Sequence, residues 1–216
     1  MSNTRSDAAR EEFERHFDHV QLMRVWMEDG SDQVNVKAYS IKLRTSGHIP
    51  IKLGLVMGDF SCAGRELESL QNAPHTVTGN FTCHHNQLSS LVGGPHNVGS
   101  NNLGGGSYSC AVNNLHSFEG APTTFTGYFI GVQQRDNSLT SLKGLPPESR
   151  LVEIPYQPDL PLLRLLDCKR IIVRSETDER HPTSDILEPY MGKGKPGAIK
   201  AAVDLIRAGY KGNAKW

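Results

Sequence analysis

The chain has 216 residues, and its 23 basic side chains balance 23 acidic ones, so the formal net charge at neutral pH is zero. This balance argues against a protein built mainly to coat nucleic acid, because such proteins carry a large basic excess. Hydrophobic residues make up only 37% of the chain, whereas 21 glycines and 12 prolines are spread along it, and this composition predicts frequent, regularly placed turns rather than disorder.

Residues 1–50 are expected to form an N-terminal cap of one helix and a strand or hairpin. Four apolar side chains recur at near-helical spacing after Ser6, a candidate helix N-cap: Phe13, Phe17, Val20 and Met27. They predict a helix within residues 7–28. Three apolar side chains then alternate along the chain and three more follow out of step, which predicts a strand or hairpin: Val34, Val36, Ala38, Tyr39, Ile41 and Leu43.

The middle of the chain, residues 51–155, repeats one unit. A copy has a glycine, an aromatic residue, a cysteine, an asparagine and two leucines at fixed places: Gly79, Phe81, Cys83, Asn86, Leu88 and Leu91. Three further copies begin at Gly58, Gly106 and Gly127. A proline follows each copy, and successive prolines are 21, 27 and 24 residues apart. These spacings indicate a 21-residue period with extra residues at 100–105 and 133–136.

The repeat predicts a solenoid of about four coils that stack through a parallel β-ladder. Side chains alternate along a strand, so the aromatic residue and the cysteine of each copy point inward together. The asparagine is expected to bond backbone groups of the neighbouring coil, and the leucines to fill the interior. Two copies depart from this pattern, with Arg65 in place of the asparagine and Gly131 in place of the cysteine. We expect weaker bonding at the first position and a gap in the inward column at the second.

The segment Phe81-x-Cys83-x-x-Asn86-x-Leu88-x-x-Leu91 resembles the core of a leucine-rich repeat, with phenylalanine and cysteine in two of the leucine places. The short period and the Gly-x-Pro segments are similar to the short bacterial class found in effector ubiquitin ligases. The units and the end of the chain also resemble uncharacterised leucine-rich-repeat proteins of bacteriophages. The resemblance covers about half the chain and implies an α/β-type repeat solenoid, a short leucine-rich-repeat arc with caps at both ends. It implies no activity.

Residues 156–216 are expected to form a C-terminal helical cap within the same continuous domain. The pattern predicts a last ladder strand at 151–154, a short apolar helix at 160–166, a strand at 170–174 and a polar loop at 175–182. A final helix is predicted from Pro196 to Gly209. One face of this helix is marked by apolar side chains: Ile199, Ala202, Val203 and Ile206.

No residue pattern in the chain indicates catalysis, a cofactor or a metal ion. The inward cysteines Cys62, Cys83 and Cys110 are spaced by the repeat and form no C-x-x-C pair, and His84 and His85 complete no metal-binding motif. We interpret the cysteines as a buried column of free thiols. The motifs of hydrolases, zinc proteases and phosphate-binding loops are absent from the sequence. The sequence therefore predicts a protein that is not an enzyme.

The outward side chains of the ladder are the expected partner-binding residues. By alternation they form columns of small, mostly neutral residues with an apolar end. A third column also passes through Ala63 and Ala111. The predicted partner-binding set is Asp59, Ser61, Asn80, Thr82, His84, Ser107, Ser109, Tyr128, Ile130 and Val132. A secondary basic surface is predicted near the end of the chain: Lys193, Lys195, Lys200, Arg207 and Lys211. It is either a solvated helix face or a contact surface for phosphates or for an acidic protein.

Together these features predict a non-enzymatic, protein-binding module of the cytoplasm. Its few cysteines, its charged first residues and its lack of an apolar run near the roughly 18 residues of a membrane span fit that location. The resemblance implies a phage-encoded accessory in the host cytoplasm that binds a host or phage protein, for host takeover or counter-defence. Two alternatives stay open: a virion or assembly component, and nucleic-acid binding through the basic C-terminal helix.

Overall fold

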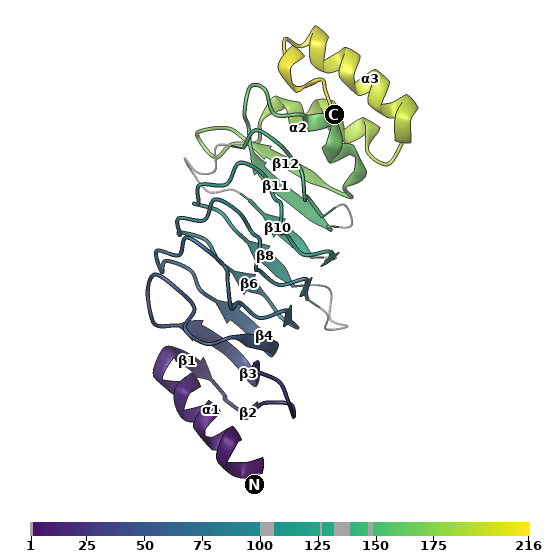
Figure 1. Cartoon of the computed structure of the whole chain (residues 1–216). Coiled ribbons are helices and arrows are strands. Elements are labelled where there is room, and N and C mark those ends of the chain that lie inside the picture. The colour runs from purple at the N-terminus through teal and green to yellow at the C-terminus, as the bar shows by residue number, and fades with distance from the viewer. Residues whose placement is uncertain (1, 100–105, 126, 132–138, 147–148) are drawn as a thin grey trace.

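The computed structural model describes residues 2–99, 106–125, 127–131, 139–146 and 149–216. These residues form an elongated stack of coils with helices at both ends (Figure 1). The predicted repeat solenoid, with an N-terminal helix and strand cap and a C-terminal helical cap, is confirmed. Val132 and the extra residues expected at 100–105 and 133–136 lie outside the described residues.

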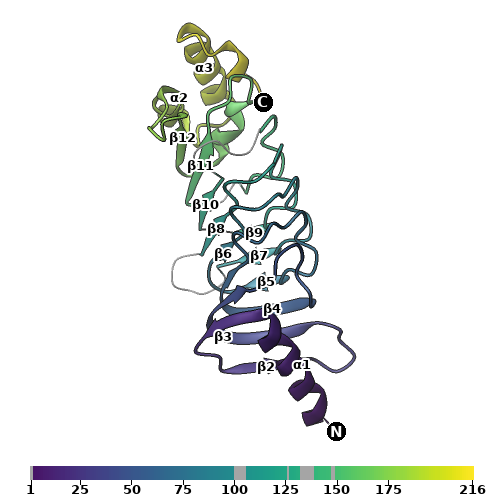
Figure 2. The same ribbon diagram turned by 90° about the vertical axis from the view of Figure 1, so that its left-hand side faces the viewer.

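Two parallel ladders hold the coils together. The main ladder consists, in spatial order, of β3 (Val34–Leu43), β4 (Leu53–Ser61), β6 (Phe81–Thr82), β8 (Ser107–Ser109), β10 (Tyr128–Ile130), β11 (Leu151–Pro155) and β12 (Ile171–Arg174). A shorter ladder branches from β4 and continues through β5 (Thr76–Val77), β7 (Asn97–Val98) and β9 (Thr124–Phe125). Figure 2 shows this second ladder. Among the described residues, helices occur only in the two caps.

Aromatic rings and thiols fill the interior of the main ladder in separate columns. One column stacks rings with centroid separations of 5.7, 5.0 and 5.4 Å from coil to coil: Phe60, Phe81, Tyr108 and Phe129. The next inward column is made of buried free thiols: Cys62, Cys83 and Cys110. Both columns confirm the predicted inward register. The gap expected at Gly131 is filled, because the ring of Phe118 lies 3.0 Å from where a Cβ on Gly131 would be.

The asparagines join adjacent coils, as the repeat predicts. Asn113 Oδ1 accepts a hydrogen bond from the Leu88 amide at 3.0 Å, and its Nδ2 donates to the carbonyls of Cys83 and Cys110 at 3.1 and 3.0 Å. Asn86 makes the equivalent bonds one coil earlier. Arg65, which stands in the asparagine position of the first copy, donates from Nε to the Leu43 carbonyl at 2.6 Å. The substitution therefore keeps a bond to the preceding strand.

A column of glycines marks the bend between the two ladders: Gly58, Gly79, Gly106 and Gly127. A Cβ on Gly106 would overlap the carbonyl oxygen of Gly79, and a Cβ on Gly127 would overlap that of Gly106. The close approach of successive coils therefore requires glycine at both positions.

The N-terminal cap differs from the helix predicted within residues 7–28. Helix α1 (Ser2–His16) is followed by two strands, β1 (Phe17–Val20) and β2 (Arg24–Trp26). Both strands pair antiparallel with β3, because the first ladder strand would otherwise leave a row of backbone groups unpaired. The rings of Phe13 and Phe17 stack 4.9 Å apart and are buried. The helical spacing of the apolar residues thus continues past the end of the helix.

The out-of-step apolar pattern in the first ladder strand comes from a bulge. Lys37 pairs with Met57 of β4, and Ser40 pairs with Asp59, so β3 holds one more residue than β4 over this stretch. The extra residue resets the alternation. Ala38 and Ile41 are therefore both buried, although three positions separate them, and Tyr39 is exposed.

The C-terminal cap contains the predicted strands and helices and three further short elements. A 3₁₀ helix, η1 (Leu162–Asp167), lies between β11 and β12, where a short apolar helix was predicted. Beyond the predicted loop come α2 (Pro182–Leu187), η2 (Glu188–Tyr190), α3 (Gly194–Arg207) and η3 (Lys211–Asn213). Asn213 fixes the end of the chain by donating to the carbonyls of Gln157 and Leu160 at 2.7 and 2.9 Å. None of the described helices is long and apolar enough to span a bilayer.

The glycine column generates the first testable prediction. We expect Gly106→Ala to lower the free energy of unfolding by about 2–3 kcal/mol or more, because the methyl group forces adjacent coils apart. Gly64→Ala is the control: Gly64 has a φ of 64° and open space around its Cβ position, so the variant bears only a backbone strain of about 1 kcal/mol. Urea denaturation followed by circular dichroism measures both. Equal losses in the two variants would contradict the close approach.

The asparagine contacts generate the second prediction. Asn113→Ala should lower the free energy of unfolding by about 2–4 kcal/mol, because a buried amide and two carbonyls lose their partner. The neighbouring Asn114 is exposed, so Asn114→Ala should change the same quantity by less than about 0.5 kcal/mol. Thermal and urea denaturation of the two variants provide the comparison. A small effect of Asn113→Ala would mean that water satisfies these backbone groups.

Candidate functional site

The outward side of the main ladder, called here the ladder face, presents the predicted columns in register. One column consists of Asp59, Asn80, Ser107 and Tyr128, and the next of Ser61, Thr82, Ser109 and Ile130. All eight side chains are exposed or half-buried. In the third column Ala63 and His84 are half-buried, but Ala111 is buried at 1% exposure. The third column is therefore not a continuous surface.

Two of the predicted contact residues already serve the fold. Asp59 Oδ1 accepts a hydrogen bond from the Asn80 amide at 2.7 Å, and Asn80 Oδ1 accepts one from the Ser107 amide at the same distance. Each side chain thereby satisfies a backbone donor at the start of the ladder segment in the next coil. Both Oδ1 atoms already accept a hydrogen bond. Asp59 and Asn80 can therefore contact a partner mainly through their remaining polar atoms.

The apolar end of the ladder face lies at β10–β12 and is larger than predicted. Tyr128 is 38% exposed and Ile130 is half-buried. The register adds Leu151 beside Tyr128 and places Ile172 beyond Glu153 in the column of Ile130. Both added residues are half-buried. Sequence reasoning missed them, although extending the outward alternation into the two predicted strands at 151–154 and 170–174 would have found them.

Charged groups lie beside this apolar end and, at Glu153, between two of its residues. The Arg150 guanidinium lies 5.9 Å from the centroid of the Tyr128 ring, a cation–π distance that restrains the ring. Arg174 forms an ion pair with Glu153 at 3.5 Å. The surface thus combines an aromatic ring, aliphatic neighbours and charged groups of both signs.

His84 and His85 form a pair at the edge of the ladder face. Their Nδ1 atoms lie 2.7 Å apart, and the rings meet edge to face. A hydrogen bond between two imidazole nitrogens needs one donor and one acceptor, so at least one ring is neutral. Burial, and then the neighbouring His85, lower the pKa of His84. Both effects favour the neutral form of the His84 ring.

The interior column of thiols offers no nucleophile. Burial raises the pKa of Cys62 to about 12 and raises that of Cys83 well above its ordinary value, so the reactive thiolate is not formed at neutral pH. The hydroxyl of Tyr108 is buried beside this column, and no hydrogen bond of normal geometry satisfies it within the described part of the chain. Among the described residues, no three His, Cys, Asp or Glu side chains are grouped to hold a metal ion.

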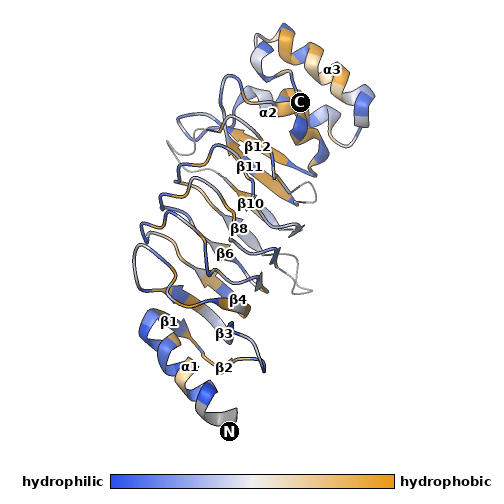
Figure 3. Ribbon diagram, in the orientation of Figure 1, coloured by the Kyte–Doolittle hydropathy of each residue, from blue (hydrophilic) through white to orange (hydrophobic). Residues whose placement is uncertain are grey.

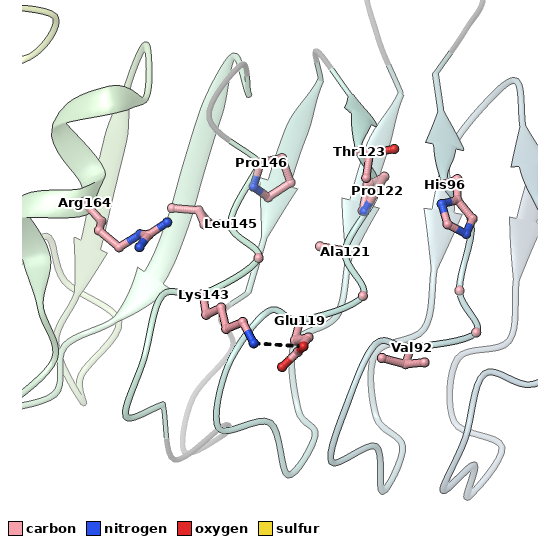
Figure 4. Close-up of a pocket in the computed structure, with 14 residues that line it drawn as sticks. Val92, His96, Glu119, Ala121, Pro122, Thr123, Lys143, Leu145, Pro146 and Arg164 are labelled. Atoms are coloured by element: carbon pink, nitrogen blue, oxygen red, sulfur yellow. Dashed lines mark hydrogen bonds and ion pairs between the residues drawn. The ribbon is translucent and has the colours of Figure 1, made fainter. Parts of the chain in front are cut away.

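A separate groove runs along the turns that precede the prolines (Figure 4). Its volume is about 590 Å³, and none of the ladder-face residues lines it. Val92, Pro122 and Pro146 contribute apolar surface from successive coils. Glu119 and Lys143 form an ion pair at 3.0 Å across adjacent coils, and Arg164 lies at one end. The groove was not predicted from the sequence, although two Gly-x-Pro segments of the repeat, at 120–122 and 144–146, line it.

The predicted basic residues lie in or beside α3 and η3, and all of them are exposed: Lys193, Lys195, Lys200, Arg207 and Lys211. Only some of this charge is compensated locally. Arg207 contacts Asp204 at 3.5 Å, and Asp204 also accepts a hydrogen bond from the Tyr190 hydroxyl. The basic surface belongs to the C-terminal cap and contributes no residue to the ladder face.

Comparison with known proteins gives no relative: no family model, no curated protein and no solved structure matches the chain. The site therefore has to be interpreted from its own geometry.

The histidines generate a prediction about pH. We expect the free energy of unfolding to fall as the pH is lowered from about 7.5 to about 5.5, across the range in which histidine titrates. The pKa of His84 is lowered by burial and by His85, and that of His181 is lowered by burial. The unfolded chain therefore binds protons at a higher pH than the folded chain, so stability is retained above the ordinary histidine pKa and lost below it.

Urea titrations at the two pH values measure this loss. His84→Gln should reduce the pH dependence, whereas substitution of the exposed His48 by glutamine should leave it unchanged. A pH dependence that is identical in the chain with and without His84 would show that this histidine pair does not contribute.

Proposed function

We propose that this protein is a non-enzymatic binding module that holds a segment of a partner protein on its ladder face. The observation that carries the proposal is the apolar end of this face, formed by Tyr128, Ile130, Leu151 and Ile172. Tyrosine is one of the residue types that supply most of the binding energy at protein interfaces, and contacts around such an anchor exclude water from it. Stacking of the coils orders the strands before a partner binds, so the protein loses little conformational entropy on binding.

The partner segment suited to this surface is an extended strand or loop with apolar side chains. Tyr128 on β10 lies beside Leu151 on β11, and Ile172 on β12 lies beyond Glu153 in the column of Ile130, so the apolar residues extend over three adjacent strands. Glu153, which lies between Ile130 and Ile172 and pairs with Arg174, and Arg150 supply charged groups of both signs. Charges of both signs favour a protein segment over a uniformly charged phosphate backbone.

The resemblance to phage leucine-rich-repeat proteins supports a biological context for this module. In that context the protein is a phage-encoded accessory of the host cytoplasm, and its partner is a host protein or another phage protein. A virion or assembly component would use the same surface, and capture of a structural protein in the experiment below would assign that role. Nucleic-acid binding has less support, because the formal net charge of the whole chain is zero.

Replacement of Tyr128 by a photo-crosslinking phenylalanine analogue tests the proposal directly. The purified chain is incubated with host or infected-cell lysate, illuminated, and analysed by mass spectrometry. We expect one protein to be crosslinked at position 128 and not at Val92, an exposed residue (62%) outside the ladder face. Equal crosslinking at both positions would indicate nonspecific capture.

With the partner in hand, Tyr128→Ala should weaken binding by about 1–3 kcal/mol, the usual effect of removing an aromatic anchor. The melting temperature should hardly change, because Tyr128 is on the outward side of β10. Val92→Ala is the matched control and should leave the affinity unchanged. Intact binding together with a lower melting temperature would show that Tyr128 acts in the fold and not in recognition.

A further inference from the structure

Helix α3 has apolar side chains on two opposite sides. Ala198, Ala201 and Leu205 are buried against the rest of the C-terminal cap. Ile199, Val203 and Ile206 are 60%, 40% and 50% exposed. At roughly 100° per residue, these three project within about 60° of one another and away from the buried side. Figure 3 shows the hydrophobic colouring of α3 at the end of the molecule. A surface helix usually has one apolar stripe, so the fold does not account for the second.

The exposed stripe has the spacing of a helix-pairing seam. Ile199, Val203 and Ile206 follow one another at intervals of four and three residues, which is the spacing of the a and d positions of a heptad repeat. Ile199, Val203 and Ile206 belong, with Ala202, to the apolar face predicted from the sequence. Nothing in the described part of the chain covers these three side chains. A second helix laid against this seam would bury all three side chains at once.

Basic side chains border the seam. Lys200 and Arg207 are seven residues apart and lie on the same side of it, at the flanking positions that select a partner in paired helices. Lys195 lies on the opposite side. Within the described residues, neither Lys195 nor Lys200 takes part in an ion pair. An occupant with acidic residues beside its own apolar seam would therefore gain attraction on both sides.

We propose that α3 is the docking site for an amphipathic helix of another protein that carries acidic residues beside its apolar seam. A second copy of the same chain does not fit, because two α3 helices side by side would place Lys200 and Arg207 against each other or against Lys195. A membrane surface fits less well, because membrane-lying helices bury a broad stripe with large side chains such as Trp, Phe and Leu. Here the stripe is narrow and aliphatic.

The probe for this test is a synthetic helix of three heptads with leucine at the a and d positions and glutamate at the flanking e and g positions. Its glutamates repel one another, so it stays monomeric at neutral pH. A second peptide has lysine at the same flanking positions. Fluorescence anisotropy with the full-length protein measures both affinities. We expect saturable binding of the glutamate peptide and at least about tenfold weaker binding of the lysine peptide.

Two sets of variants locate the site. Ile199→Ser combined with Val203→Ser should weaken binding of the glutamate peptide at least about tenfold, whereas Met23→Ser combined with Val92→Ser, exposed apolar residues elsewhere, should not. Lys200→Glu combined with Arg207→Glu should transfer the preference to the lysine peptide. All of these side chains are exposed, so the melting temperature should stay unchanged. Tyr128→Ala should have no effect, which separates this docking site from the ladder face.

Several results would overturn the proposal. These are equal binding of the two peptides, an absence of saturable binding, and a loss of binding that follows Tyr128→Ala instead of the α3 variants. Concentration-dependent self-association that disappears in the Ile199→Ser, Val203→Ser variant would replace the helical partner by a second copy. Sedimentation with phosphatidylserine-containing vesicles that depends on the same two residues would replace it by a membrane surface.

Discussion

Successive coils of this protein approach so closely that one corner of each turn has room for a hydrogen atom and for no side chain. The carbonyl oxygen of Gly79 occupies the space of a Cβ on Gly106, and the carbonyl oxygen of Gly106 occupies that of a Cβ on Gly127. This approach brings backbone groups of adjacent coils within hydrogen-bonding distance in both ladders. It also aligns the ring column of Phe81 and Tyr108 and lets Asn113 reach two coils with one side chain.

The same approach determines which outward side chains of the ladder are engaged by the fold. In the early coils, the outward side chains of Asp59 and Asn80 are drawn into bonds to the next coil, so they support the fold. Farther along the ladder the corresponding positions hold Tyr128 and Leu151, whose side chains cannot make such bonds. The ladder face therefore changes from a structural surface to a candidate recognition surface along its own length, without a change in backbone geometry.

The repeated segments of the fold could be predicted from the sequence, because each copy places the same residue types in the same structural environment. The inward register, the asparagine contacts and the apolar residues Tyr128 and Ile130 follow from that. The internal bonds of Asp59 and Asn80 could not be predicted, because they depend on the distance between coils. The caps occur only once, so no second copy guides their prediction. In residues 17–20, pairing with β3 overrides the helical spacing of the apolar side chains. In α3 small alanines make the buried contact and larger side chains stay exposed, and hydropathy alone does not reveal this.

The branching of the sheet at β4 has a consequence for how the chain assembles. Strand β4 pairs with β3, β5 and β6, so both ladders start from one template in the first third of the chain. Each later coil pairs mainly with the coil synthesised just before it, so every loop that has to close is short. A nascent chain can therefore add folded coils singly as it leaves the ribosome, and the C-terminal helices close a structure that is already formed.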